Sequence, residues 1–213
     1  MTLAQIHDRL LGWASSDLMK EELLRARKRY FDRFGEPNEE DKSFESRMNG
    51  FLDWYLYNYA PEGGGDNVIE RFIKAEGAAI PTDELNLYRT LGKNTHSIFE
   101  VRRIKKDEIR LRDIFTAGDH DVTERRTLAG LEKGDLIEAR LMPYDSRLFF
   151  SGAFLYHPPA VRKIIFAQVK KLKKAAGKGQ MPDVEAFLGQ LSKAALKMER
   201  YRNVKVESIY SFE

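Results

Sequence analysis

"EKGDLIEARLMPYDSRLFFSGAFLYHPP", residues 132–159, is the stretch that decides the fold. A charged turn precedes an alternating segment, and "YDSR" then predicts a second turn. Residues 148–156 return as a strand that is apolar on both faces, so both of its faces must be covered. The stretch therefore predicts a β-hairpin that needs a core on one side and a further layer on the other.

The first strand of this hairpin has a register that its own alternation fixes. Ile137, Ala139 and Leu141 are expected to point into the core, whereas Glu138 and Arg140 are expected to face water. A half-buried strand of this kind is typical of an antiparallel sheet with one solvated face.

Upstream of the hairpin, residues 97–115 read as another hairpin, and "TAGDHDVTERR" as a turn followed by a short strand. About five short strands in about sixty residues predict a small antiparallel β-barrel of SH3-like or OB-like type over residues 94–157. The helix that starts at Pro159 is expected to fold back over residues 148–156, and Gly152 is expected to ease its close approach.

The flanking regions read as helical, so the predicted fold class is α+β. Residues 1–93 form a helical region in which the segment around Trp54 has aromatic residues on both faces, as expected of a helix buried between layers. Residues 158–213 predict two helices packed on the barrel and a last strand in "NVKVESIYSF".

Composition excludes several kinds of chemistry. The chain has 213 residues and no cysteine, so disulfides, zinc-thiolate sites and cysteine nucleophiles are excluded. Its four histidines show no metal-ligand spacing, and Ser151 lacks a nucleophile-elbow motif. No catalytic residue, metal or cofactor is therefore predicted.

The first residues show neither a signal peptide nor a membrane-spanning run, so no membrane contact is predicted and a cytoplasmic protein is expected.

Positive charge is concentrated in one predicted helix. The chain carries a formal net charge of +3, yet residues 160–179 contain seven cations and no acid. One interpretation is an ordinary solvated helix face. The other is a binding face for an acidic protein or a nucleic acid, with an aromatic anchor. The candidate partner-binding residues are Arg162, Lys163, Phe166, Lys170, Lys173 and Lys174.

Arginines of the predicted barrel form a second candidate surface, since small barrels bind nucleic acid through basic groups and aromatic stacking. Acidic residues are interleaved with them, which favours a mixed solvated surface. The arginines are Arg102, Arg103, Arg110, Arg112, Arg125 and Arg126.

The run "SIFEVRRIKKDEIRLRDIFTAGDHDVTERRTLAGLEKGDLIEARL", preceded by "FLDWYLYNYAPEGGG", resembles a pattern in uncharacterised bacterial proteins. In that family a helical segment with an F-L-D-W-type motif and a glycine loop precedes a small β-domain with S-x-x-E-V, L-x-D and G-D-L elements. The resemblance covers about residues 51–158. Some relatives carry a C-terminal SEC-C-type zinc motif, but this chain has no cysteine, so no zinc role carries over. The resemblance implies no activity.

Together these features predict a non-catalytic binding or regulatory protein that acts through protein–protein or nucleic-acid contacts. The alternative is a hydrolase-like enzyme with a site between the helical region and the barrel.

Overall fold

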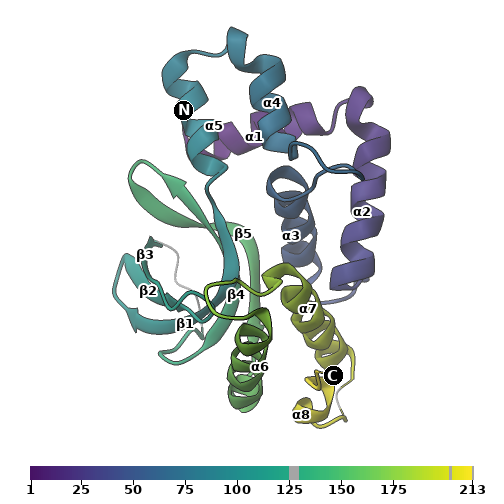
Figure 1. The fold of residues 1–213 in the computed structure, drawn as a ribbon, viewed down its shortest axis with the longest axis vertical. Helices are drawn as coiled ribbons and strands as arrows, with labels where there is room; N and C mark the ends of the chain where they lie inside the picture. Colours follow the sequence, from purple (N-terminus) through teal and green to yellow (C-terminus); the bar gives the residue numbers. More distant parts are fainter. Residues whose placement is uncertain (125–129, 202, 213) are drawn as a thin grey trace.

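A computed structural model describes residues 1–124, 130–201 and 203–212 of the chain. The described residues form an α+β structure in which helices from both ends of the chain flank a small barrel (Figure 1). The N-terminal helical segments are α1 (Leu3–Ala14), η1 (Asp17–Met19), α2 (Lys20–Phe34), α3 (Phe44–Tyr57), α4 (Val68–Glu76), η2 (Gly77–Ala79) and α5 (Thr82–Leu91). The C-terminal ones are η3 (Pro159–Val161), α6 (Arg162–Ala176), α7 (Val184–Arg200) and α8 (Val206–Ile209).

Five strands close into a barrel in the order β1-β2-β3-β5-β4, with β4 paired back to β1. All neighbours run antiparallel except β3 and β5, which pair in parallel and complete the barrel. Of the two expected barrel types, this five-stranded Greek-key arrangement is the OB-like one. The strands are β1 (Thr95–Ile104), β2 (Glu108–Asp113), β3 (Asp119–Thr123), β4 (Leu136–Tyr144) and β5 (Arg147–His157).

The side-chain orientation predicted for β4 is correct at its apolar positions and wrong at its polar ones. Ile137, Ala139 and Leu141 are buried, as the alternation predicts. The prediction that Glu138 and Arg140 face water is wrong, because they are only 5% and 2% exposed. Helices cover the outer face of β4, so the polar positions of the alternation point into a second buried layer rather than into solvent.

Hydrogen bonds offset part of the cost of burying the charges of Glu138 and Arg140. The Arg140 guanidinium donates to the side-chain oxygen of Asn58 at 2.7 Å and also to that of Asn94. Glu138 Oε1 lies 3.0 Å from His96 Nε2 on the neighbouring strand. These contacts are what a buried charged group requires if it is not to destabilise the fold.

Helix α3, and not α6, packs along β5, so the expected cover for that strand is wrong. The Ser46 hydroxyl donates to the carbonyl of Phe154 at 2.7 Å and accepts the amide of the same residue at 2.8 Å. Gly152 does allow a close approach, because a Cβ there would lie 3.1 Å from the Asn49 side chain of α3. Helix α6 follows β5 in sequence, but the 3₁₀ turn at Pro159–Val161 leads the chain away from that face.

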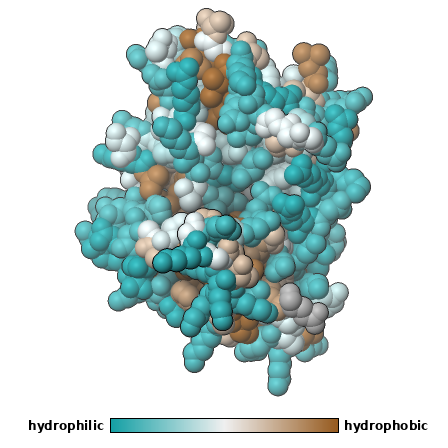
Figure 2. Space-filling view, in the orientation of Figure 1, coloured by the Kyte–Doolittle hydropathy of each residue, from teal (hydrophilic) through white to brown (hydrophobic). Residues whose placement is uncertain are grey.

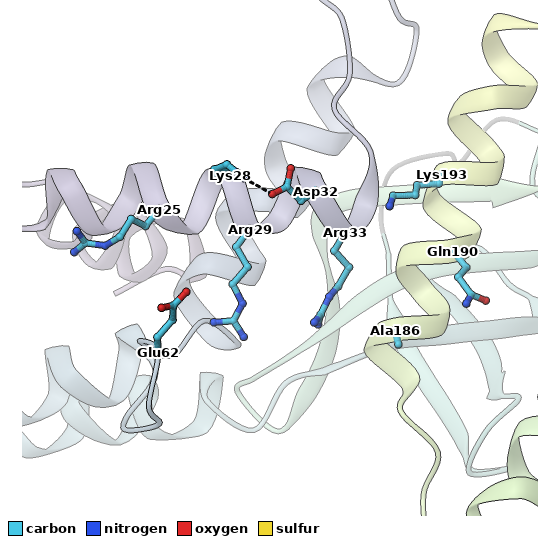
Figure 3. Close-up of a pocket in the computed structure, with 9 residues that line it drawn as sticks. All are labelled: Arg25, Lys28, Arg29, Asp32, Arg33, Glu62, Ala186, Gln190 and Lys193. Carbon is cyan, nitrogen blue, oxygen red and sulfur yellow. Dashed lines mark hydrogen bonds and ion pairs between the residues drawn. The ribbon is translucent and has the colours of Figure 1, made fainter.

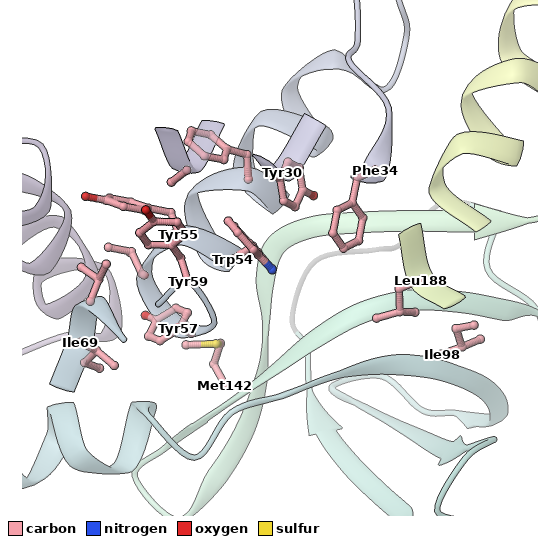
Figure 4. Close-up of a cluster of buried hydrophobic side chains, with 14 of the residues drawn as sticks. Tyr30, Phe34, Trp54, Tyr55, Tyr57, Tyr59, Ile69, Ile98, Met142 and Leu188 are labelled. Carbon is pink, nitrogen blue, oxygen red and sulfur yellow. The ribbon is translucent and has the colours of Figure 1, made fainter. Parts of the chain in front are cut away.

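Two apolar clusters build the core. The smaller fills the barrel and includes Phe99, Leu111 and Phe150. The larger joins helices from both ends of the chain to the outer surface of the barrel, as Figure 4 shows for Trp54 and Leu188 among others. Trp54 is 1% exposed, which confirms that α3 is buried between layers.

The expected last strand is wrong. Within residues 203–212 the structure has the short helix α8, and Tyr210 is fully buried. The barrel is closed, so it offers no unpaired edge along which a further strand could add. The apolar side chains Ile209, Tyr210 and Phe212 instead pack on the larger cluster.

Among the described residues, no helix combines the length and the apolar composition needed to cross a bilayer.

Replacing Trp54 tests the role of α3. Trp54→Ala is expected to lower the free energy of unfolding by about 3–5 kcal/mol, because it leaves a large cavity between α2 and the barrel. Urea denaturation followed by circular dichroism measures the change, with the half-buried Trp13→Ala as a comparison that should cost less. A loss below about 1 kcal/mol for Trp54→Ala would contradict a core role.

Burial of His157 predicts acid sensitivity. Desolvation lowers the pKa of this imidazole from 6.5 to about 4, and its Nδ1 lies 3.2 Å from the Tyr210 hydroxyl. The unfolded chain takes up this proton near pH 6.5 while the folded one does not, so the stabilisation is present above pH 6.5 and is lost as the pH falls toward 4.

His157→Gln removes this proton uptake. The wild type should therefore lose up to about 1.4 kcal/mol per pH unit more than the variant between pH 6.5 and 4. Denaturant titrations at a series of pH values give the difference between the two slopes. Parallel slopes for the two proteins would show that His157 does not stay neutral in the fold.

Candidate anion-binding surface

Helix α6 is held on the barrel by an apolar stripe. Val161, Ile165 and Val169, four residues apart, are buried in the larger core cluster. This spacing places them on one face of a helix, so the remaining positions point sideways or outward. The cations of α6 consequently have different environments.

Two of the six predicted binding residues are structural anchors. Arg162 bonds Glu100 of β1 at 2.6 Å and the carbonyl of Gly134 at 3.1 Å. Lys173, in the last turn of α6, donates to the carbonyl of Ile114 at 2.9 Å. These contacts hold both ends of α6 to the barrel.

Phe166 is also engaged by the protein itself. Its ring is half-buried and packs on the larger cluster, while the Arg162 guanidinium carbon lies 4.8 Å from the ring centroid. One face of the ring is therefore already covered by a cation. A base stacking on Phe166 would have to displace Arg162, so the structure favours a packing role for this residue.

The other three predicted residues, Lys163, Lys170 and Lys174, are exposed. At about 100° per residue they fall within about 40° of one another around the helix. They span about 16 Å along its axis at about 1.5 Å per residue. No carboxylate among the described residues forms an ion pair with any of them, nor with the exposed Lys171 and Lys178. We call Lys163, Lys170 and Lys174 the α6 lysine stripe.

Figure 2 shows that the face of the molecule seen in Figure 1 is mainly hydrophilic, with smaller separate hydrophobic patches. An interaction on such a surface depends on charge and hydrogen bonding more than on burial of a large apolar area.

A second cationic surface lies in a groove between α2 and α7, which sequence reasoning missed. The groove has a volume of about 650 Å³, and Arg29 and Arg33 project into it from α2 while Lys193 reaches toward it from α7 (Figure 3). The two helices approach closely, since a Cβ at Gly189 would lie 2.9 Å from the Arg33 carbonyl oxygen. The four-residue spacing of Arg25, Arg29 and Arg33 was a signal for the α2 side, but nothing local pointed to α7.

Most cations of this groove already have partners. Lys28 pairs with Asp32 at 2.7 Å, and Arg33 with Glu185. Arg29 donates to a backbone carbonyl at 3.1 Å and lies 5.8 Å from the Trp54 ring. The cations of the groove thus have more partners within the protein than those of the α6 lysine stripe.

The barrel arginines are compensated as well. Arg110 forms two hydrogen bonds with the Asp121 carboxylate, its Nε donating at 2.7 Å, and Arg112 lies 3.5 Å from Asp119. Arg103 pairs with Glu108 at 3.4 Å and Arg102 with Glu100 at 2.9 Å. Arg125 and Arg126 lie outside the described residues. This pairing supports the mixed solvated surface that the interleaved acids predict.

A family model described as a family of unknown function, DUF7986, matches residues 3–188. The chain belongs to this family. The part of the chain that matches DUF7986 contains the whole barrel and all of α6, whereas Lys193 of the α2–α7 groove lies beyond it. No curated protein and no solved structure matches the chain.

The environment of Phe166 leads to a prediction. Phe166→Ala is expected to lower the free energy of unfolding by roughly 1–3 kcal/mol, since a half-buried ring loses part of the packing of a fully buried one. Lys170→Ala, a neighbouring exposed position, should change it by less than about 0.5 kcal/mol. Chemical denaturation of both variants provides the comparison. Unchanged stability for Phe166→Ala would return the ring to its predicted role as a binding anchor.

Proposed function

We propose that this protein is a non-catalytic binding protein that contacts the phosphate backbone of a nucleic acid through the α6 lysine stripe. The observation that carries the proposal is that the three lysines are exposed, aligned and without a carboxylate partner among the described residues. Phosphate contacts by lysine release condensed counterions, which supplies affinity without sequence recognition.

The composition of this face favours a nucleic acid over an acidic protein. Protein interfaces have apolar cores enriched in aromatic residues, and lysine is depleted there. The exposed apolar residues of α6 near the stripe are the alanines Ala167 and Ala175, and the neighbouring Phe166 is half-buried with Arg162 over its ring. A row of cations without an apolar centre suits a backbone of regularly spaced phosphates.

The anchoring of α6 supports the same choice. Arg162 and Lys173 use their own charges to hold the helix on the barrel. The stripe is therefore presented on a fixed element, and less conformational entropy is lost on binding than with lysines on a loop.

The alternative of a hydrolase-like enzyme with a site between the helices and the barrel remains a prediction. The described residues contain no group of three or more metal-ligand side chains. A pocket does lie between the helices and the barrel, lined by residues of α1, α3, β4 and β5.

Charge reversal tests the proposal. Binding of a short duplex to the wild type should fall with salt, with a slope of roughly −3 in log K against log [salt] if three phosphates are neutralised. Changing Lys163, Lys170 and Lys174 together to Glu should abolish this binding and leave the fold intact, because exposed lysines contribute little stability. Fluorescence anisotropy at several salt concentrations measures both effects.

A matched triple variant controls for net charge. Changing the exposed Lys20, Lys93 and Lys106 to Glu alters the net charge by the same amount at sites away from α6. This variant should retain most of the binding and the salt slope. The proposal is wrong if the control loses as much binding as the α6 variant. It is also wrong if polyglutamate binds through the stripe and neither DNA nor RNA binds at low salt, since the partner is then an acidic protein.

A further inference from the structure

A pocket of about 460 Å³ lies between the helical region and the barrel. Helices α1 and α3 form one side of it, and strands β4 and β5 form the other. Its volume falls within the range of about 300–1,000 Å³ that is usual for small-molecule sites. The pocket contains none of the residues of α6 or of the α2–α7 groove.

The walls of the pocket are largely apolar. Leu3 of α1, Leu52 of α3 and Met142 of β4 line it, and Phe150 of β5 borders it although its ring belongs to the cluster inside the barrel. Such walls suit the hydrocarbon or aromatic body of a small ligand, with a few polar groups fixing its orientation.

Two carboxylates set the charge of the pocket. Asp53 is 5% exposed; its Oδ1 lies 3.5 Å from His7 Nε2, and its Oδ2 has no hydrogen-bond partner. Asp8 is exposed at the pocket and pairs with no cation among the described residues. A buried carboxylate without full pairing is costly unless other charges or hydrogen-bond donors compensate for it.

The charge of the buried Arg140 interacts with that of Asp53. Arg140 does not line the pocket, and its donors are used by Asn58 and Asn94. No lysine or arginine is among the lining residues. An anionic ligand would therefore meet carboxylates without a cation in the pocket wall, whereas a cationic ligand would compensate for them.

We propose that this pocket binds a small amphipathic amine, with its apolar body against the wall of Leu3, Leu52 and Met142 and its ammonium group toward Asp8 and Asp53. The His7 ring, between α1 and the Asp53 carboxylate, is the positioning group for that carboxylate. This site is independent of nucleic-acid binding through the α6 lysine stripe.

The lining of the pocket also includes Ser151, but its hydroxyl accepts the amide of Ala153 at 3.3 Å, and no hydrogen bond joins it to His7 among the described residues. A nucleophile and its base need to lie within hydrogen-bond reach. The geometry thus points to binding, and no reaction is assigned to the pocket.

Three compounds of similar size test the charge selection. Phenethylamine, 3-phenylpropionate and 3-phenylpropanol differ chiefly in the charged or neutral group that follows the same aromatic body. Isothermal titration calorimetry and saturation-transfer NMR should show the amine binding about tenfold or more tightly than the carboxylate, with the alcohol between them. In an Asp8→Asn/Asp53→Asn double variant, this preference should fall to about twofold or less.

Ala4→Trp provides a test that does not depend on a buried charge. Ala4 is exposed on α1 and lines the pocket, so the larger side chain should fill it and abolish amine binding while the circular dichroism spectrum is retained. Asp17→Asn, an exposed acid outside the pocket, should bind the amine like the wild type.

The proposal is overturned if the carboxylate binds as tightly as the amine, if amine binding survives Ala4→Trp, or if none of the three compounds binds at about millimolar concentration. Duplex binding by the Ala4→Trp variant should keep the salt slope of the wild type. The two proposals can therefore fail separately.

Discussion

The fold depends on burying the charged outer face of β4. Glu138 and Arg140 lie under helices rather than in water, so each must find partners in the covering layer. The Arg140 guanidinium reaches Asn58 at the end of α3 and Asn94 between α5 and β1, and its carbon lies 5.6 Å from the Tyr57 ring centroid. One side chain thus joins the barrel to two helix ends, and removing one partner of such a buried charge typically costs about 3–5 kcal/mol.

This constraint fixes α3, and α3 in turn positions the rest. It approaches α2 so closely at Gly50 that a Cβ there would lie 2.9 Å from the Tyr30 hydroxyl, and it hydrogen-bonds to β5 through Ser46. With α3 along β5, that face is unavailable to α6, and α6 packs instead through Arg162 and Lys173 on other parts of the barrel. The same placement of α3 forms the Asp53 wall of the pocket beside α1.

Local patterns predicted the elements well and their partners poorly. The alternation of Ile137, Ala139 and Leu141 correctly indicated the barrel interior, because side chains on that face meet only other apolar strands. It could not show whether Glu138 faced water or the partly exposed His96, since both environments accept a carboxylate. The alternation in residues 203–212 failed similarly, because a strand also needs a free edge and the closed barrel provides none.

For the candidate sites, too, the sequence predicted features of single elements but not the contacts between elements. The stripe of α6 lysines follows from helical periodicity, so the sequence was enough to place Lys163, Lys170 and Lys174 together. Its pattern could not separate them from Arg162 and Lys173, whose partners Glu100 and Ile114 come from distant strands and turns. The pocket has no local signal at all, because its walls come from α1, α3, β4 and β5.

A solvated lysine face costs little to maintain, so exposure by itself does not make α6 a binding surface. What distinguishes α6 is the difference between its two sets of cations. Arg162 and Lys173 have hydrogen-bond partners on the barrel, whereas the α6 lysine stripe has no carboxylate partner among the described residues. The contacts of Arg162 and Lys173 restrict the motion of α6 relative to the barrel. The α6 lysine stripe is therefore held at a fixed spacing along the helix. Fixed spacing matters for a phosphate backbone, whose charges are themselves regularly spaced. It is the physical reason that we propose this helix as the nucleic-acid surface, rather than the barrel arginines or the α2–α7 groove, whose cations mostly have partners within the protein.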